Sequence, residues 1–294
     1  MDISFAPLST GSFAWPDTAL QQHPFYAQTL ARFGTDSIAA QFSVAGQPVG
    51  HAQIFRRRLG PIPVAWVPRG PVWTPDTSPE LRRESLKRLP RAARWRALWA
   101  HIPDSGTAPG LCVAPGPLMA ELDLTRDSTT RRAAQHGKWR NRLCRAESAD
   151  LHINLRRLKL AQDAPLLMRE IAQRRARRYC GLPARFTENW PRDQTLIATA
   201  HVRPDSPVIA FMLFLLHAPT ASYHIGWSGP EGRALNAHTL LLWRACEHLA
   251  ALGFARLDLG LCDPSRTPGL ARFKSGSGAH IRRIGATTLS AHLI

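Results

Sequence analysis

The chain of 294 residues is long for one compact domain and fits two domains of about 100–200 residues each. Its composition is 44% hydrophobic with 9 Trp and 11 Phe, which excludes a mainly disordered chain. Lys and Arg total 38 against 21 Asp and Glu, so the net charge of +17 favours partners that carry phosphate, such as RNA, nucleotides or an anionic lipid surface. An Arg-rich surface that serves no partner is the alternative that composition leaves open.

The amino terminus and the cysteines bear on location and metal binding. Residues 1–5 contain no basic stretch that leads into an apolar run, so no secretory signal is indicated. The apolar run Pro207 to Leu216 is half the length of a membrane-spanning helix and predicts a buried strand. The cysteines, which we expect to be reduced and mostly buried, show no Cys-x-x-Cys pair; they are Cys112, Cys144, Cys180, Cys246 and Cys262. We expect a cytoplasmic protein without a metal site or a membrane-spanning segment, although peripheral contact with anionic lipid is compatible with the charge.

The first half of the chain predicts a domain that mixes helix and strand. Helices are expected at Pro24–Phe33 and at Ser78–His101, the second one kinked or broken by Pro90. Strands are expected at Ser37–Val44, His51–Phe55, Val64–Trp73 and Leu118–Leu124. A strongly basic helix from Thr129 to Glu147 follows, and we place the domain boundary just after it, near Asp150, giving domains 1–150 and 151–294.

The second half predicts strands that alternate with helices. Strands are expected at His152–Leu155, Thr195–Val202, Val208–His217, Ser222–Trp227 and Arg256–Gly260. Helices are expected at Ala164–Arg178 and Ala237–Leu252, and Gly253 ends the latter. The turn Arg203 to Ser206 joins two of the strands as a hairpin. This order favours the α/β class, with mixed sheets and helices on their faces.

Several motifs in the last seventy residues resemble the carboxy-terminal signature of the FemABX family. They are Tyr223-His-Ile-Gly-Trp227, Leu240-Leu-Leu-Trp243, Leu257-Asp-Leu-Gly260 and Pro268-Gly-Leu-Ala-Arg-Phe-Lys-Ser-Gly276. Weaker similarities lie upstream in the expected order, at Gln22–Tyr26, Pro68–Val72 and Trp139–Glu147. The resemblance implies two tandem GNAT-like acyltransferase domains and the transfer of an amino acid from aminoacyl-tRNA to an amine, with the tRNA as co-substrate and no other cofactor.

The resemblance also implies roles for individual residues. Lys274 and Phe273, with Arg272 beside them, are expected to meet the acceptor-end nucleotides of the charged tRNA, since a cation neutralises phosphate and a ring stacks on a base. Their Pro-Gly turn places them near the end of the strand Arg256–Gly260, outside the carboxyl end of the sheet. The remaining candidates are Asp258 as the best placed acid, Tyr223 and Trp227 in the substrate site, and Arg140 and Arg142 as ligands for phosphates. For each of these residues a packing, capping or solvent-exposed role is the alternative.

The chain departs both from the pattern of an enzyme that binds acyl-CoA and from the pattern of FemABX relatives. The turn that leads into the helix Ala237–Leu252 has no glycine in its final residues, which disfavours a pyrophosphate cradle for acyl-CoA. His238 at the start of that helix is a weaker candidate for a general base. Trp73 and Thr74 precede Asp76 where FemABX relatives commonly have an acid that faces a peptidoglycan-precursor acceptor, so the acceptor could be another peptide, a small amine or a lipid amine. Two alternatives stay open: an acyl-CoA-dependent N-acyltransferase, and an RNA-binding module without catalysis.

Overall fold

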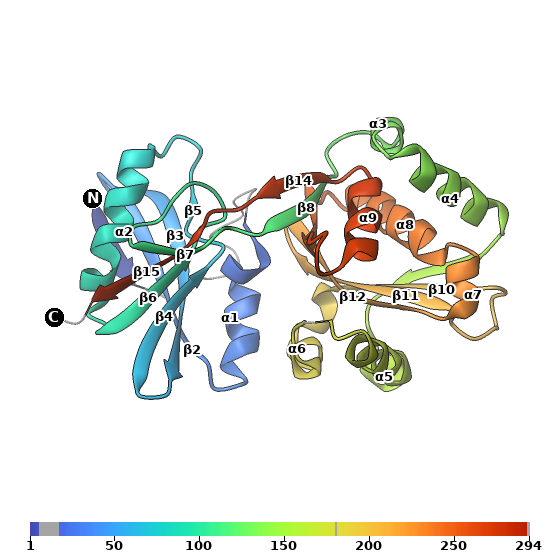
Figure 1. Cartoon of the computed structure of the whole chain (residues 1–294), viewed down its shortest axis with the longest axis horizontal. Coiled ribbons are helices and arrows are strands. Elements are labelled where there is room, and N and C mark those ends of the chain that lie inside the picture. Colours follow the sequence, from blue (N-terminus) through green and yellow to red (C-terminus); the bar gives the residue numbers. More distant parts are fainter. Residues whose placement is uncertain (6–17, 180, 293–294) are drawn as a thin grey trace. The chain divides into compact units, whose positions relative to one another are not determined.

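A computed structural model describes residues 1–5, 18–179 and 181–292 of the chain, which divide into two compact units (Figure 1). Unit 1 comprises residues 1–118 and 282–294, and unit 2 comprises residues 119–281. The boundary predicted near Asp150 is therefore wrong. The basic helix that ends just before Asp150 packs on two later helices of unit 2, and the last strand of the chain returns to the sheet of unit 1.

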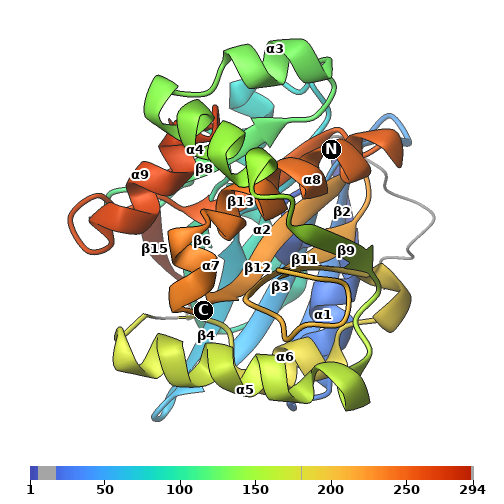
Figure 2. The same ribbon diagram turned by 90° about the vertical axis from the view of Figure 1, so that its right-hand side faces the viewer.

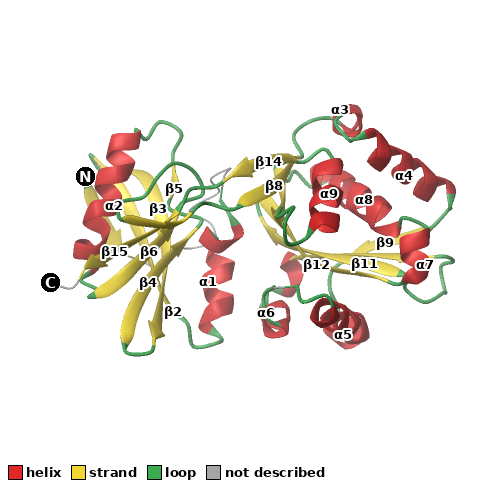
Figure 3. Ribbon diagram, viewed as in Figure 1, coloured by secondary structure: helices red, strands yellow, loops and turns green. Residues whose placement is uncertain are grey.

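Unit 1 is built on one mixed sheet in the order β1-β2-β3-β4-β6-β15-β7, with β5 paired to β3. Its strands are β1 Asp2–Phe5, β2 Asp36–Val44, β3 Gln47–Leu59, β4 Ile62–Pro68, β5 Val72–Trp73, β6 Ala97–Ile102, β7 Leu111–Ala114 and β15 Thr287–His292. The 3-10 turn η1 Leu20–Gln22, α1 Pro24–Ala31 and α2 Pro79–Ala93 complete the unit. Helices α1 and α2 lie on opposite faces of this sheet (Figure 3).

The predicted helix Ser78–His101 is correct only in its first two thirds. Helix α2 runs through Pro90 without a break and ends where Arg94 takes a left-handed conformation (φ 53°). The residues that follow form β6, whose alternate side chains are buried. Trp99 on the inward face joins the core that Leu86 and Leu89 of α2 also fill, so tertiary burial decides for strand here.

Unit 2 is built on a second mixed sheet in the order β14-β8-β13-β12-β11-β10-β9. Its strands are β8 Leu118–Asp123, β9 His152–Arg156, β10 Thr195–His201, β11 Ala210–His217, β12 Thr220–Ser228, β13 Arg256–Leu261 and β14 His280–Arg283. Its helices are α3 Ser128–Ala133, α4 Gly137–Ser148, α5 Leu160–Ala176, α6 Ala184–Asn189, α7 Pro230–Ala234, α8 Ala237–Ala251 and α9 Pro268–Gly276, with the 3-10 turn η2 Arg192–Gln194. Helices α8 and α9 cover one face of the sheet, and α5 and α6 cover the other (Figures 1 and 2).

Most predicted elements of unit 2 are confirmed within a few residues, including the hairpin of β10 and β11. The single basic helix predicted at Thr129–Glu147 is instead two helices, α3 and α4. The apolar run at Pro207 to Leu216 is the buried strand β11, and no helix in the described part of the chain is long and apolar enough to cross a membrane. Cys246 and Cys262 are buried, whereas Cys112 and Cys144 are exposed, and Cys180 lies outside the described residues.

Candidate active site

The central feature of unit 2 is a separation between two parallel strands. β12 and β13 pair only from Thr220 to Ser222 and from Arg256 to Asp258. Beyond this point β12 continues along β11, whereas β13 continues along β8. Parallel strands that part in this way leave unpaired backbone groups at their carboxyl ends, where open α/β sheets bind ligands.

Lys274 lies at this point, in a setting that the sequence did not predict. It belongs to helix α9, which begins with Pro268 as a favourable first-turn residue, rather than to a loop. Its side chain is 5% exposed, and Nζ donates a hydrogen bond of 2.7 Å to the carbonyl oxygen of Leu261 at the end of β13. Burial lowers the pKa of Lys274 to about 8, while the nearby carboxylate of Asp258 acts in the opposite direction.

Asp258 is held by the backbone at the bulge where β13 leaves β12. Its Oδ1 accepts a hydrogen bond of 2.6 Å from the N–H of Gly260, and the residue is 3% exposed. Gly260 has φ +77°, a conformation that favours glycine, and the register between β13 and β8 shifts between Asp258 and Gly260. A side chain at Gly260 would begin 3.9 Å from Nζ of Lys274, so the bulge brings backbone and ammonium group together.

Phe273 is half-buried between two other rings. Its ring centroid lies 6.1 Å from that of Trp139 on α4 and 6.5 Å from that of His238 on α8. Nε2 of His238 lies 3.2 Å from the carbonyl oxygen of Phe211 and 3.0 Å from that of Trp227, so the neutral ring must donate from this nitrogen. His238 thus joins the ends of β11 and β12, which agrees better with a structural role than with the general base considered from the sequence.

A small cavity of about 160 Å³ lies on the other face of the sheet, between α5, α6 and β12. Ile225 contributes to the wall of this cavity, and it lies three residues beyond Ser222, the last residue of β12 that pairs with β13. Most of its lining is apolar, but Glu170 and Arg174 of α5 also line it, with Glu170 Oε1 3.3 Å from Arg174 Nε. Burial raises the pKa of Glu170, and it also raises the pKa of Tyr223, on which the carboxylate of Glu170 acts in the same direction.

His224 stands beside this cavity as a second group that was not expected from the sequence. Its Nε2 lies 2.7 Å from Oγ1 of Thr187, and burial lowers its pKa to about 4. It is the extra residue of a bulge in β12, because Leu213 pairs with Ile225 and Phe214 with Tyr223. Glu170 is an acid on an Arg-rich helix and His224 is a bulge residue. No sequence signal would have identified either one as a site residue.

The sequence profile of the acetyltransferase (GNAT) domain matches residues 128–275. The chain belongs to this family. A search of curated proteins found no significant sequence match. The fold of the whole chain is similar to that of FemX, with a TM-score of 0.78 at 11% identity, over 98% of this chain and 97% of FemX.

Two further solved structures share this fold at low identity. L-PGS from Bacillus licheniformis gives a TM-score of 0.54 at 12% identity, over 93% of this chain and 87% of that one. A conserved protein of unknown function from Bacteroides thetaiotaomicron gives 0.58 at 11% identity, over 99% and 100%. The predicted fold of two tandem GNAT-like domains, and with it the resemblance to FemABX proteins, is confirmed, and the chain is an acyltransferase by family.

The connection from β12 to α8 is the turn in which the sequence disfavours a pyrophosphate cradle, and its glycines are used for packing. A side chain at Gly232 would begin 2.4 Å from the carbonyl oxygen of Ile209. The N–H of Gly229 donates to the same carbonyl at 2.9 Å. The N–H groups of Arg233, Leu235 and Asn236 are also bonded within the connection. These amides are therefore committed to the fold rather than presented to a phosphate.

The other predicted site residues of this GNAT chain lie at the surface or against the core. Arg272, Arg140 and Arg142 are exposed on α9 and α4. Arg140 lines an open basin of about 600 Å³ whose lining also includes Trp243 of α8. Trp227 is half-buried against the core beneath α5, with the guanidinium of Arg169 5.3 Å from its ring centroid. Within the described residues no group of three His, Cys, Asp or Glu could hold a metal ion.

Two of the upstream motifs meet inside unit 1. Nε2 of Gln22 donates to the carbonyl oxygen of Pro68 at 2.6 Å, and its Oε1 accepts from the N–H of Gln53 at 2.8 Å. The same side chain fills the space beside Gly70, where any Cβ would begin 2.3 Å from it. Arg69, which is 5% exposed, binds Asp104 at 2.6 Å. These contacts between the two motifs therefore stabilise unit 1.

Proposed function

We propose that the chain transfers an amino acid from an aminoacyl-tRNA to an amine, as its resemblance to FemABX proteins implies. The supporting observation is the buried pair of Lys274 and Asp258 at the point where β12 and β13 separate. A buried ammonium group beside a carboxylate is costly to desolvate, and groups with perturbed pKa values are concentrated at functional sites. The glycines of the β12 to α8 connection, which pack against Ile209, favour this donor over acyl-CoA.

In the proposed reaction the nitrogen of the amine attacks the ester carbonyl carbon of the aminoacyl-tRNA. The bond from this carbon to the ribose oxygen then breaks, and that oxygen takes up the proton that the amine loses. The ester is already activated, so juxtaposition and stabilisation of the oxyanion supply most of the rate. Lys274 is the proposed cation at the oxyanion or at an adjacent phosphate, and Asp258 positions it and favours its charged form.

The ring of Phe273, held between Trp139 and His238, is proposed to stack on a base at the acceptor end of the tRNA. Arg272, Arg140 and Arg142 would contribute exposed positive charge along the path of the tRNA. The acceptor amine, which could carry phosphate, belongs to a peptidoglycan-precursor peptide, another peptide or a small amine. A cytoplasmic location is part of this proposal.

The second candidate is an N-acyltransferase that uses acyl-CoA, and the match to the acetyltransferase (GNAT) profile favours it. The two donors are separated by incubating the purified chain and a cell extract with pooled radiolabelled aminoacyl-tRNAs, and in parallel with radiolabelled acetyl-CoA. Label in an RNase-resistant product that depends on the chain and on Lys274 supports the tRNA donor. Label only from acetyl-CoA selects the second candidate, and saturable tRNA binding without any product selects an RNA-binding module.

A further inference from the structure

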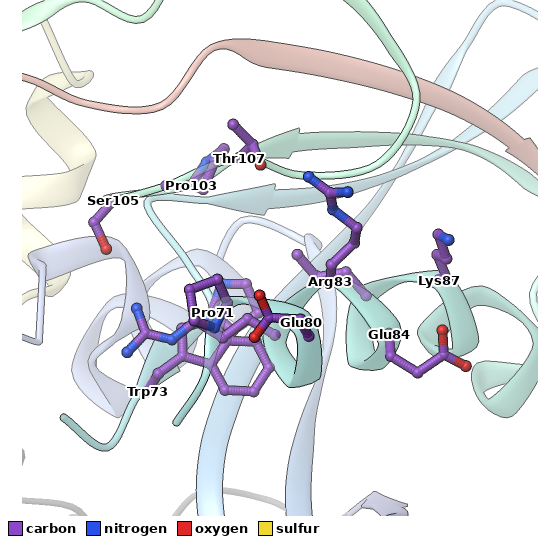
Figure 4. Close-up of a pocket in the computed structure, with 13 residues that line it drawn as sticks. Pro71, Trp73, Glu80, Arg83, Glu84, Lys87, Pro103, Ser105 and Thr107 are labelled. Atoms are coloured by element: carbon purple, nitrogen blue, oxygen red, sulfur yellow. The ribbon is translucent and has the colours of Figure 1, made fainter. Parts of the chain in front are cut away.

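Unit 1 contains a groove of about 430 Å³ between helix α2 and the loop that follows β6 (Figure 4). This volume lies within the range of pockets that bind small ligands. One wall consists of side chains of α2, among them Arg83 and Lys87, and another includes Ser105 and Thr107 of the loop. Trp73, which follows the Arg69-Gly70-Pro71 motif, lines it as well.

Among the residues that the structure describes, two cations of the groove, Arg83 and Lys87, form no direct salt bridge with its carboxylates. Of its two carboxylates, Glu84 binds Arg88 at 2.8 Å. The pKa of Glu80 is lowered by its own backbone N–H and by the hydroxyl of Ser78, and the positive charge of Arg83 acts in the same direction. Within the described part of the chain Arg83 and Lys87 form no ion pair, and their spacing of four residues puts both on the same face of α2.

The wall opposite α2 adds hydroxyl donors to the groove. The hydroxyl groups of Ser105 and Thr107 come from the opposite wall, and Figure 4 shows Arg83 extending from α2 toward the side on which Thr107 lies. Arg82 also lines the groove; its Nη2 donates to the carbonyl oxygen of Thr74 at 3.3 Å, whereas its buried Nε has no acceptor among the described residues. Two cationic groups and the hydroxyl of Thr107 suit a phosphate, whose three terminal oxygens accept several hydrogen bonds at once.

Trp73 provides a flat surface that is fixed in place. Its ring centroid is 4.8 Å from that of Phe42, and a side chain at Gly50 would begin 2.3 Å from its ring. The ring is therefore packed on the sheet of unit 1 on one side, while the half-buried side chain remains accessible from the groove. Aromatic side chains held in this way stack on flat ligand groups.

We propose that this groove is a binding site for a ligand that combines a phosphate group with a flat ring. Arg83, Lys87 and the hydroxyl of Thr107 bind the phosphate, and Trp73 stacks on the ring. The inference concerns binding by unit 1 and does not depend on the donor used by unit 2.

The test uses the full chain and three simple probes in calorimetric titrations at low salt. Phenyl phosphate has both groups, methyl phosphate lacks the ring and phenol lacks the charge. We expect phenyl phosphate to bind at least about five-fold more tightly than methyl phosphate, and phenol not to bind measurably. Arg83→Gln and Lys87→Gln should each weaken phenyl phosphate roughly ten-fold, the loss typical of one charge-assisted hydrogen bond.

Arg91→Gln is the matched control, because Arg91 is an exposed arginine of the same helix that does not line the groove. It should leave the affinity for phenyl phosphate unchanged. Equal weakening by all three variants would mean that a diffuse positive surface attracts the anion, and the proposal would be wrong. No binding of phenyl phosphate, or equal affinities for phenyl and methyl phosphate, would also overturn it. All outcomes are independent of amino-acid transfer, so they leave the proposed function untouched.

Discussion

Lys274 is the residue on which the proposed function depends most. We expect Lys274→Ala to reduce transfer by roughly 10²-fold or more, because one preorganised donor in a site shielded from water contributes that much to the rate. Single-turnover transfer from labelled aminoacyl-tRNA measures it, and Lys138→Ala, at an exposed lysine of α4, is the control. Transfer by Lys274→Ala at the rate of the unchanged chain would refute the role. Because Lys274 is buried, its replacement should also alter stability.

The pKa of Lys274 gives a second expectation, for the dependence of rate on pH. Its folded pKa is lowered to about 8, so the positive charge is present below this pH and is lost above it. A rate that needs this charge falls as the pH rises through about 8, whereas deprotonation of the acceptor amine raises the rate over the same range. We therefore expect a bell-shaped profile. Lys274→Arg should be slower but should lose the falling limb, since a guanidinium group stays protonated. A falling limb that persists in Lys274→Arg would assign it to another group.

At the scale of elements, the contact of α9 with α4 sets the position of Lys274. A Cβ at Gly276 would begin 2.9 Å from Cδ1 of Trp139, whose side chain is 3% exposed. Gly276→Ala must therefore displace α9 from α4, and we expect it to lower the free energy of unfolding by about 1–3 kcal/mol. Gly269→Ala in the first turn of the same helix meets no atom within 4 Å and should raise it by up to about 1 kcal/mol. Urea denaturation of both variants measures the difference, and equal effects would show that this contact does not determine the packing.

The elements differ in how far their local sequence determines them. Long periodic or alternating segments, such as α5, α8 and the hairpin of β10 and β11, were predictable because their local pattern and their tertiary burial agree. Strand β6 was not, because the same residues suit a helix and only packing against α2 decides. Pro268-Gly269 predicts a turn, but the structure has helix α9 there, because proline is also favourable in a first helical turn.

The candidate site was predictable in part. The placement of Lys274 and Asp258 at the end of β13 followed from motif order, and the structure brings them together. The burial of Lys274, and the cavity with Glu170 and His224, depend on how helices cover the sheet. No local pattern encodes that arrangement.

At the scale of the whole molecule, unit 1 depends on a segment far away in the sequence. Strand β15 pairs with both β6 and β7, and Arg282 binds Asp104 at 2.5 Å. Deletion of residues 282–294 should therefore expose the edges of β6 and β7 and unfold or loosen unit 1. Unit 2 keeps its contiguous residues 119–281 and should retain its structure. Hydrogen exchange by mass spectrometry should show protection lost in residues 18–118 and kept in β10, β11 and α8. Loss of protection throughout the chain would mean that the two units fold as one cooperative unit.

The net charge of +17 predicts that any binding of tRNA depends steeply on salt. Each phosphate that a cation neutralises releases counterions, so affinity falls with salt; six to ten such contacts cost about 10³–10⁵-fold between 50 and 200 mM salt. Arg140→Glu with Arg142→Glu should weaken binding and reduce the salt slope by about one for each phosphate that is no longer neutralised. Arg266→Glu is the control, because Arg266 is 88% exposed and already lies beside Asp263. Titration of labelled tRNA at several salt concentrations measures the affinity and its dependence on salt.

If Arg266→Glu changes the salt slope as much as the double variant does, the contacts are spread over the surface rather than concentrated on α4. Affinity that does not vary with salt would exclude a phosphate-dominated interface altogether.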